Sequence, residues 1–383
     1  MLNLLDEPVA LDTLELYYLE LKMVEPVEVH NNFFSSRPII ICRLISKGAQ
    51  GFSELDALNY PSYEEEFLDG ALFVIKEFIV KKILKSIKKP LSYQLLSKSL
   101  DDHIKGNFHA KSAIRIAFLD LLLNRNSIPV NLFLKDFFSE PKKPSYGRSC
   151  SIGIYKSKED LFMKAKEVIK KGFDVIRVKI SPEVNPSWLK QLREELPDVD
   201  ITLDANGSFN SFSEAVNYFV SVDDCGFLFI DQPFGADRLY DHRRLTDHIK
   251  TPISLDESVR SKWSIQNVIE IGAAEYFCIK PGRVGGLLEA LDMIQYVSSY
   301  GLKPWIGGMY NSEIGQSVVA NLLPWALFGD LPLNHNFEPQ LINNPFWYKK
   351  EFNYPNSAGF GMAVAKAKLE KNAFRIETFN LGT

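Results

Sequence analysis

Three aspartates in this chain of 383 residues each follow an apolar run, and they are the residues best suited to hold a cation. Asp204, Asp231 and Asp256 stand 27 and 25 residues apart, close to the length that a strand, a helix and their loops need. In a parallel barrel the carboxyl ends of all strands share one rim, so the three carboxylates should converge there. One such aspartate alone could be a helix N-cap, but three in register indicate a metal site. Oxygen ligands favour a hard ion, so we expect Mg²⁺, with Mn²⁺ as a substitute.

Two lysines flank these aspartates along the chain. Lys179 ends a β-rich run 25 residues before Asp204, and Lys280 ends another run 24 residues after Asp256. Strand alternation puts Arg177 on the same face as Lys179. A single lysine at a strand end is often a surface residue, but the position of these two on either side of the acid-bearing strands favours a site.

Together these residue types suit removal of a proton α to a carboxylate. Such a proton is very weakly acidic, so the reaction needs a base and strong stabilisation of a dianionic enediolate. A divalent metal bound to the substrate carboxylate supplies the stabilisation. A lysine supplies the base if its pKa is lowered, and both Arg177 and the metal charge act in that direction. The predicted partner is therefore a small-molecule carboxylate, with one lysine on each face of its α-carbon.

The elements that must position these residues change in pattern near the Pro-Lys-Lys-Pro stretch at 141–144. The part before it contains β-rich runs followed by helical spacing, which predicts an α+β domain. Its expected elements are strands at 14–23 and 37–45 and helices at 63–89 and 110–123. The first of these helices is expected to begin with three consecutive glutamates, Glu64, Glu65 and Glu66.

After this stretch, strand and helix patterns alternate strictly. Eight strand candidates, the last at 332–338, predict an α/β fold with a (β/α)8-type barrel. From residue 341 on the sequence is irregular and rich in aromatic residues, with one last β-rich piece at 373–379.

The overall composition excludes several classes of protein. A formal charge of −4 gives no footprint for nucleic acid, and no apolar run approaches 18 residues, so no membrane span or signal peptide is expected. Four scattered cysteines without a CxxC pattern indicate a reduced, cytoplasmic protein without disulfides or structural zinc. The composition allows a homo-oligomer but does not fix the oligomeric state.

The order of the motifs around the acids and lysines resembles that of the enolase superfamily, muconate-lactonising subgroup. The motifs are Arg177-Val178-Lys179, Asp204-Ala205-Asn206, Asp231-Gln232-Pro233, Asp256-Glu257-Ser258 and Lys280-Pro281-Gly282-Arg283-Val284-Gly285-Gly286. Within the superfamily, the chain is most similar to o-succinylbenzoate synthases and the related N-acylamino acid racemases. The resemblance covers nearly the whole chain.

The resemblance implies a modified (β/α)7β TIM-type barrel at 146–339 under an α+β capping domain at 1–145, which about 340–383 complete. It implies that Lys179 is the base and that Lys280 faces it across the substrate. The implied Mg²⁺ ligands are Asp204, Asp231 and Asp256. The implied supporting residues are Arg177 and Asn206.

Three departures from the family pattern put the substrate in doubt. The family usually has Glu where Asp231 stands and Lys where Arg177 stands. Its Gly-Gly-Met-Leu-Glu-Thr/Ser-Gly loop is altered here at Tyr310 to Glu313. The leading hypothesis is a Mg²⁺-dependent o-succinylbenzoate synthase that dehydrates 2-succinyl-6-hydroxy-2,4-cyclohexadiene-1-carboxylate. The alternatives are an N-acylamino acid racemase or dipeptide epimerase using the same lysines, and a barrel that no longer turns over, which the intact lysines disfavour.

Overall fold

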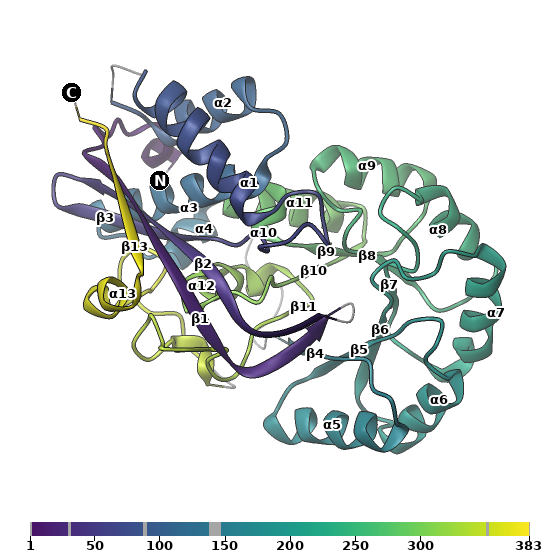
Figure 1. Cartoon of the computed structure of the whole chain (residues 1–383). Coiled ribbons are helices and arrows are strands. Elements are labelled where there is room, and N and C mark those ends of the chain that lie inside the picture. Colours follow the sequence, from purple (N-terminus) through teal and green to yellow (C-terminus); the bar gives the residue numbers. More distant parts are fainter. Residues whose placement is uncertain (1, 30–31, 87–89, 138–146, 350–351, 383) are drawn as a thin grey trace.

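The computed structural model describes residues 2–29, 32–86, 90–137, 147–349 and 352–382. It contains a closed barrel of parallel strands and a separate antiparallel sheet with its own helices, referred to below as the cap (Figure 1). This confirms the predicted fold class. Among the helices in these ranges, none combines the length and apolar character that crossing a membrane requires.

Eight parallel strands close the barrel in the order β10-β11-β4-β5-β6-β7-β8-β9. Their bounds are β4 (Gly147–Ile152), β5 (Val175–Lys179), β6 (Asp200–Asp204), β7 (Ile230–Asp231), β8 (Ile253–Leu255), β9 (Tyr276–Ile279), β10 (Lys303–Ile306) and β11 (Phe328–Gly329). Seven of them lie where the sequence pattern predicts strands.

The prediction for the eighth barrel strand is wrong. The strand that closes the barrel is β11, where Gly329 pairs with Ile306 of β10 and Phe328 pairs with Gly147 of β4. Within the predicted strand at 332–338, β12 (Phe337–Glu338) instead pairs antiparallel with the cap. A two-residue strand that contains a glycine leaves no apolar run, so periodicity does not reveal it.

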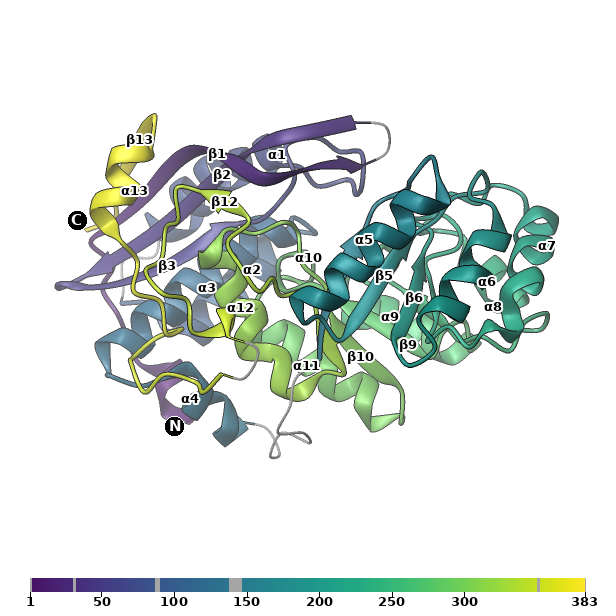
Figure 2. The ribbon, with the colours of Figure 1, turned by 90° about the horizontal axis from the view of Figure 1, so that it is seen from below.

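Helices surround the barrel on its outer side (Figure 2). They are α5 (Lys158–Lys171), α6 (Pro186–Glu195), α7 (Phe212–Val222), α8 (Leu239–Leu245), α9 (Lys262–Ile271) and α11 (Leu287–Ser299). Two more helices of this part of the chain, α10 (Pro281–Val284) and α12 (Glu313–Leu322), lie against the cap. Polar N-cap side chains fix where several of them begin, since each accepts a hydrogen bond from a first-turn N–H group. These N-caps are Ser157, Asn185, Ser211, Ser261 and Ser312.

Aromatic side chains fill the barrel interior below the acidic rim. Phe229, Trp305 and Phe328 stack on one another with ring centroids 5.4–6.1 Å apart. The Trp305 indole also donates a hydrogen bond of 3.0 Å to Ser254 Oγ. The barrel is therefore a packed core, and polar groups gather at its carboxyl end.

The cap sheet is built from the N-terminal strands and two C-terminal ones. Its strands are β1 (Thr13–Val29), β2 (Asn32–Ser46), β3 (Ala49–Leu55), β12 and β13 (Arg375–Asn380), and both β12 and β13 pair with β1. Its helices are α1 (Leu68–Phe73), the π-helical segment η2 (Val74–Leu84), α2 (Tyr93–His103), α3 (Phe108–Arg125) and α4 (Val130–Phe137). The boundary at 145/146 stays a prediction, because residues 138–146 lie outside the described ranges.

The predicted helix at 63–89 begins later than expected. Phe67 has extended backbone and α1 begins at Leu68, so the three glutamates lie in the loop between β3 and α1. Residues 87–89 of that prediction lie outside the described part of the chain. The other predicted helix, at 110–123, is confirmed as α3, which is buried along nearly its whole length.

Candidate active site

The three aspartates converge on the carboxyl rim of the barrel. Asp204 ends β6, Asp231 ends β7, and Asp256 directly follows β8. Asp204 and Asp231 are register partners on neighbouring strands. All three are buried, with 0–2% of their surface exposed. The structure therefore brings together the side chains that the strand spacing predicts to meet.

Arg177 occupies the centre of this acidic rim. Its guanidinium lies over the Trp305 ring, 4.3 Å from the centroid. One terminal nitrogen, Nη2, lies 3.1 Å from both Asp204 Oδ2 and Asp231 Oδ2. The other, Nη1, lies 2.5 Å from Oδ2 of Asp330, which follows β11. Asp330 went unpredicted because the strand that carries it has no sequence signature.

Lys179 approaches the acids from β5. Its Nζ lies 3.3 Å from Asp204 Oδ2 and donates a hydrogen bond to Asn206 Oδ1. Burial pushes the pKa of Lys179 down, but the charge of Asp204 pushes it up, and the net direction is up. Arg177 acts in the expected direction and lowers this pKa, but the expected lowering also depends on the charge of a bound metal ion, so it stays a prediction.

Lys280 approaches from the opposite side, directly after β9. Its Nζ lies 2.8 Å from Asp256 Oδ2. Its alkyl chain passes so close to Gly307 that a Cβ there would lie 2.5 Å from Lys280 Cε, so only glycine fits. Burial lowers the pKa of Lys280, but the Asp256 charge raises it and the net direction is up.

The strand order shows how the two lysines are related. Between β5 and β9 lie β6, β7 and β8 on one side and β4, β11 and β10 on the other. Lys179 and Lys280 therefore stand on diametrically opposite strands of the barrel mouth. The strands that carry the three aspartates fill one of the two arcs between them.

Glu257 is a further acid that the prediction left out, although it directly follows Asp256. Its Oε1 accepts a hydrogen bond of 3.1 Å from Asn206 Nδ2, while its Oε2 is buried without a partner among the described residues. Burial, Asp256 and Asp204 raise the pKa of Glu257 to about 7. Asn206 thus connects Lys179 to Glu257, and its left-handed backbone, with φ of 43°, turns its side chain between them.

Tyr63 reaches the site from the cap. Its hydroxyl donates a hydrogen bond of 2.6 Å to Asp256 Oδ2 and accepts one of 2.6 Å from Lys280 Nζ. No sequence signal points to this residue, because 193 positions separate it from Asp256 along the chain.

The altered loop after β10 is held by the cap as well. The Tyr310 carbonyl accepts a hydrogen bond from Arg37, which forms a buried ion pair of 3.2 Å with Glu54. Glu54 also accepts hydrogen bonds from the backbone N–H and the hydroxyl of Ser312, at 2.8 and 2.6 Å. These contacts hold Tyr310 in a left-handed conformation with φ of 51°, which is unusual for an aromatic residue.

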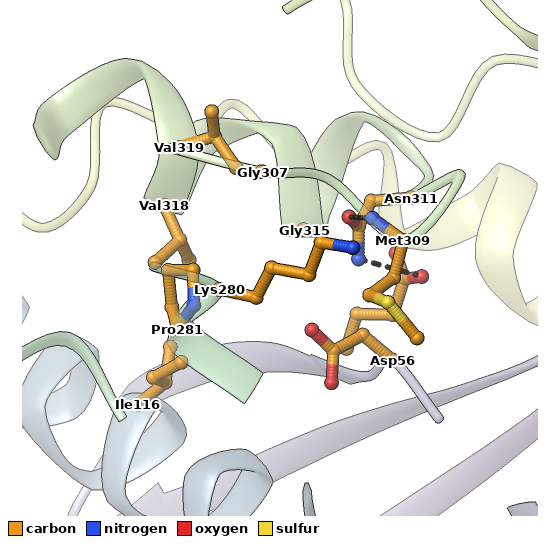
Figure 3. Close-up of a pocket in the computed structure, with 11 residues that line it drawn as sticks. Asp56, Ile116, Lys280, Pro281, Gly307, Met309, Asn311, Gly315, Val318 and Val319 are labelled. Atoms are coloured by element: carbon orange, nitrogen blue, oxygen red, sulfur yellow. Dashed lines mark hydrogen bonds between the residues drawn. The ribbon is translucent and has the colours of Figure 1, made fainter. Parts of the chain in front are cut away.

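Two small cavities adjoin these groups. A cavity of about 150 Å³ is lined by Ser62, Tyr63, Asn206, Gly207, Gln232, Gly235, Ala236 and Glu257. Figure 3 shows the second, where Lys280 extends towards Asn311 and Met309, with the Asp56 carboxylate across from it. The first cavity lies against the β6–β8 arc, and the second lies between Lys280 and the cap.

The donor chemistry of the rim fits a hard divalent cation. Four cationic side chains (Arg177, Lys179, Lys280, Arg283) face five acids (Asp204, Asp231, Asp256, Glu257, Asp330). Asp231 Oδ1 is buried without a hydrogen-bond partner among the described residues, as is Glu257 Oε2. Burial and the charges of Asp256 and Asp204 raise the pKa of Asp231 well above its usual range. The rim therefore has oxygen acceptors that the protein's own cations do not satisfy.

The present spacing of these acids is wider than a bound ion requires. Within the described ranges, no group of three or more His, Cys, Asp or Glu side chains lies close enough together to hold an ion. The contacts explain why, since Arg177 lies between two of the aspartates, and Lys280, Tyr63 and Arg283 hold Asp256. The ligand roles of the three aspartates therefore stay a prediction.

Comparison with known proteins agrees with this geometry. The Enolase C-terminal domain-like family matches residues 160–368. An o-succinylbenzoate synthase from Geobacillus kaustophilus is 29% identical over 362 residues, covering 93% of this chain and 94% of that protein. An N-succinylamino acid racemase from Thermus thermophilus is 29% identical over 308 residues, 80% of each chain. A solved enolase-superfamily structure from Listeria innocua superposes with a TM-score of 0.88 at 24% identity, covering 97% of this chain and 100% of that one.

The family match spans more than half of the chain, and the solved structure has the same fold over nearly all of it. The chain therefore belongs to the Enolase C-terminal domain-like family and is an enzyme of the enolase superfamily.

Proposed function

We propose that this enzyme is a Mg²⁺-dependent o-succinylbenzoate synthase of menaquinone biosynthesis. The observation that carries the proposal is the placement of Lys179 and Lys280 on opposite strands of the barrel mouth, with the three aspartates on the arc between them. That arrangement suits a small carboxylate whose α-carbon lies between the lysines. The four cysteines are free thiols, which supports a cytoplasmic enzyme.

The substrate would be 2-succinyl-6-hydroxy-2,4-cyclohexadiene-1-carboxylate. Lys179 removes the proton from the ring carbon that bears the carboxylate, which gives an enediolate. The same lysine then returns that proton to the hydroxide leaving the neighbouring carbon, so one water is lost and the ring becomes aromatic. Asn206 orients Lys179, because its side-chain oxygen accepts a hydrogen bond from the Lys179 ammonium.

Lys280 has a different task in this reaction. Its ammonium stays protonated beside Asp256 and stabilises the enediolate from the opposite face by its charge. When bound, a divalent cation would lower the pKa of both lysines and stabilise the enediolate. Asp204, Asp231 and Asp256 would hold it, and the unpartnered oxygen of Glu257 lies beside Asp256 to support it.

A second candidate function is racemisation of N-succinylamino acids. The same pair of lysines favours it, because each enantiomer needs a base on its own face of the α-carbon. The Thermus thermophilus relative that carries this name is also 29% identical to the chain, over 308 residues against 362 for the synthase relative. We rank dehydration first because it needs only one of the two lysines to titrate.

The experiment that tests the proposal follows dehydration by the purified protein before and after chelation with EDTA. We expect chelation to abolish turnover and added Mg²⁺ or Mn²⁺ to restore it. Asp256→Asn should weaken metal binding while the circular dichroism spectrum stays that of the wild type. Full turnover by metal-free protein would refute the proposed mechanism.

A further inference from the structure

The loop at residues 56–67, between β3 and α1, crosses from the cap into the site; we name it the cap loop. Tyr63 lies on it, and its hydroxyl is hydrogen-bonded to both Asp256 and Lys280 at 2.6 Å. Its ring also lies 4.6 Å from Lys280 Nζ, near enough for a cation–π contact. A residue of the cap thus engages one of the two facing lysines and one of the three rim aspartates.

Asp256 has no oxygen free of the protein's own groups. Its Oδ2 accepts hydrogen bonds from Tyr63 and from Lys280, which use both lone-pair positions of that oxygen. Its Oδ1 accepts a hydrogen bond of 2.5 Å from Arg283. Lys280 and Arg283 belong to the barrel, and of these three partners only Tyr63 belongs to the cap.

Two glutamates next to Tyr63 fix the cap loop in place. Glu64 bonds Arg283 at 2.8 Å with one oxygen and His109 Nε2 at 2.7 Å with the other. Glu66 accepts hydrogen bonds of 2.8 and 3.1 Å from the backbone N–H groups of Phe108 and His109, in the first turn of α3. Glu64 thus joins the loop to both parts of the protein, while Glu66 joins it to the cap.

Glu65, between them, contributes much less. Its partner is Arg260, at 2.6 Å, but the side chains of the two are 72% and 36% exposed. Solvent screens such a pair, so its effect on the position of the loop is small. The chain therefore offers Glu65 as a matched control for Glu64.

We propose that Tyr63 is a gate on the site: its hydroxyl is bonded to Asp256 and Lys280, and it must leave Asp256 before a divalent cation can use that carboxylate. The proposal rests on the proposed function for the role of Asp256 as a ligand. The cavity of about 150 Å³ that Tyr63 lines offers the ring space beside its present position. Glu64 and Glu66 hold the gate closed by anchoring the part of the loop that directly follows Tyr63.

The direct test is the affinity for Mg²⁺ without substrate, measured by isothermal titration calorimetry. Tyr63→Phe keeps the ring and removes the hydroxyl that competes for Asp256, so we expect Mg²⁺ to bind about three- to tenfold more tightly than in the wild type. Tyr60→Phe is the control, because Tyr60 lies on the same loop with 67% of its surface exposed, and its affinity should equal that of the wild type. Unchanged or weaker binding by Tyr63→Phe overturns the gate.

Hydrogen exchange tests the anchoring separately from any metal. Glu64→Gln should speed amide exchange in peptides covering 56–67 several-fold, whereas Glu65→Gln should leave it unchanged. Equal exchange in the two variants overturns the anchoring role of Glu64.

The gate and the proposed function can fail independently. Tighter Mg²⁺ binding by Tyr63→Phe in a protein that does not dehydrate the cyclohexadiene supports the gate and refutes the synthase. If the wild type dehydrates the cyclohexadiene but the wild type and Tyr63→Phe bind Mg²⁺ with equal affinity, the synthase is supported and the gate is refuted.

Discussion

Arg177 and Asp231 show what a departure from the family pattern does at the scale of single residues. Arg177 is longer than the lysine usual in the family, and Asp231 is shorter than the usual glutamate. In the structure one Arg177 nitrogen donates hydrogen bonds to both Asp231 and Asp204. The longer arginine side chain thus reaches the carboxylate of the shorter Asp231. The rim therefore keeps its pairing of opposite charges through both departures.

At this scale the two lysines separate the candidate reactions. Lys179→Ala should lower both dehydration and racemisation by about 10²–10⁴-fold, because it removes the base. Lys280→Arg keeps a cation but removes a base that titrates, so we expect measurable dehydration and no racemisation. The measurements are loss of the cyclohexadiene and exchange of the α-proton with deuterium for each enantiomer of an N-succinyl amino acid. Racemisation by Lys280→Arg that matches the wild type would contradict this division of roles.

The aspartates and lysines of the rim could be predicted because each lies at the end of its own β-rich run. Glu257 could have been found as well, since it follows Asp256 directly. Tyr63 and Asp330 could not be predicted. Tyr63 comes from a loop of the cap, and Asp330 follows β11, a strand of only two residues. Local periodicity carries no information about contacts between distant segments.

At the scale of elements, the cap loop depends on the charge of His109. This buried imidazole lies 2.7 Å from Asp56 with one ring nitrogen and 2.7 Å from Glu64 with the other. Burial lowers its pKa, but the two carboxylates outweigh burial and raise it to about 10. Asp56 in turn lies against Gly282 of α10, where a Cβ would come within 2.0 Å of its carboxylate. His109 therefore stabilises the contact between cap and barrel as a cation.

This pKa predicts a pH dependence of stability. Between about pH 6.5 and 10 the folded protein keeps the His109 proton while the unfolded chain loses it, so stability falls as pH rises. The contribution is complete below about pH 6.5 and is lost as pH passes about 10, an effect on the order of a few kcal/mol. Denaturant titrations at several pH values should show a shallower loss in His109→Gln than in the wild type, with exposed His103→Gln as the control. Equal slopes in the wild type and His109→Gln would contradict the prediction.

Most elements could be read from periodicity, and the exceptions have physical reasons. The helical spacing of apolar residues predicts a helix that includes Glu64, Glu65 and Glu66, yet these three charges make tertiary contacts from a loop. The strand β11 has only two residues, which lie between β10 and β4 and close the barrel. Two residues are too few to show an alternating pattern, so the sequence does not reveal this strand.

At the scale of the whole molecule, the C-terminal segment completes the cap. β13 pairs with β1 from Thr13 to Tyr18, and Ile376 lies opposite Tyr17 although about 360 positions separate them. The sequence shows a β-rich piece at 373–379 but not its partner; only the family resemblance pointed to the cap. Asp120 of α3 holds a second contact of this segment, since its carboxylate accepts hydrogen bonds from the backbone N–H groups of Phe52 and Phe360 at 2.8 and 3.0 Å.

Replacement of Asp120 should therefore loosen the C-terminal segment. The carboxylate of Asp120 has two acceptor oxygens, whereas an asparagine side chain has one. In Asp120→Asn one of the two backbone N–H groups therefore faces the side-chain NH₂ without an acceptor, which should destabilise the protein by about 1–3 kcal/mol. The measurement is the thermal midpoint together with amide exchange in 352–382. Asp102→Asn, at an exposed position of the cap, should leave both unchanged. A thermal midpoint of Asp120→Asn equal to that of the wild type would show that this contact does not hold the segment.

The central claim is that the opposed lysines perform a dehydration, and one measurement tests it most directly. It is the ratio of kcat/KM for loss of water from 2-succinyl-6-hydroxy-2,4-cyclohexadiene-1-carboxylate to kcat/KM for racemisation of N-succinyl amino acids, on one Mg²⁺-loaded preparation of the purified enzyme. We predict that dehydration is the more efficient reaction and that Lys179→Ala lowers its kcat/KM by about 10²–10⁴-fold. Efficient racemisation with no dehydration would contradict the account and establish the second candidate function in its place.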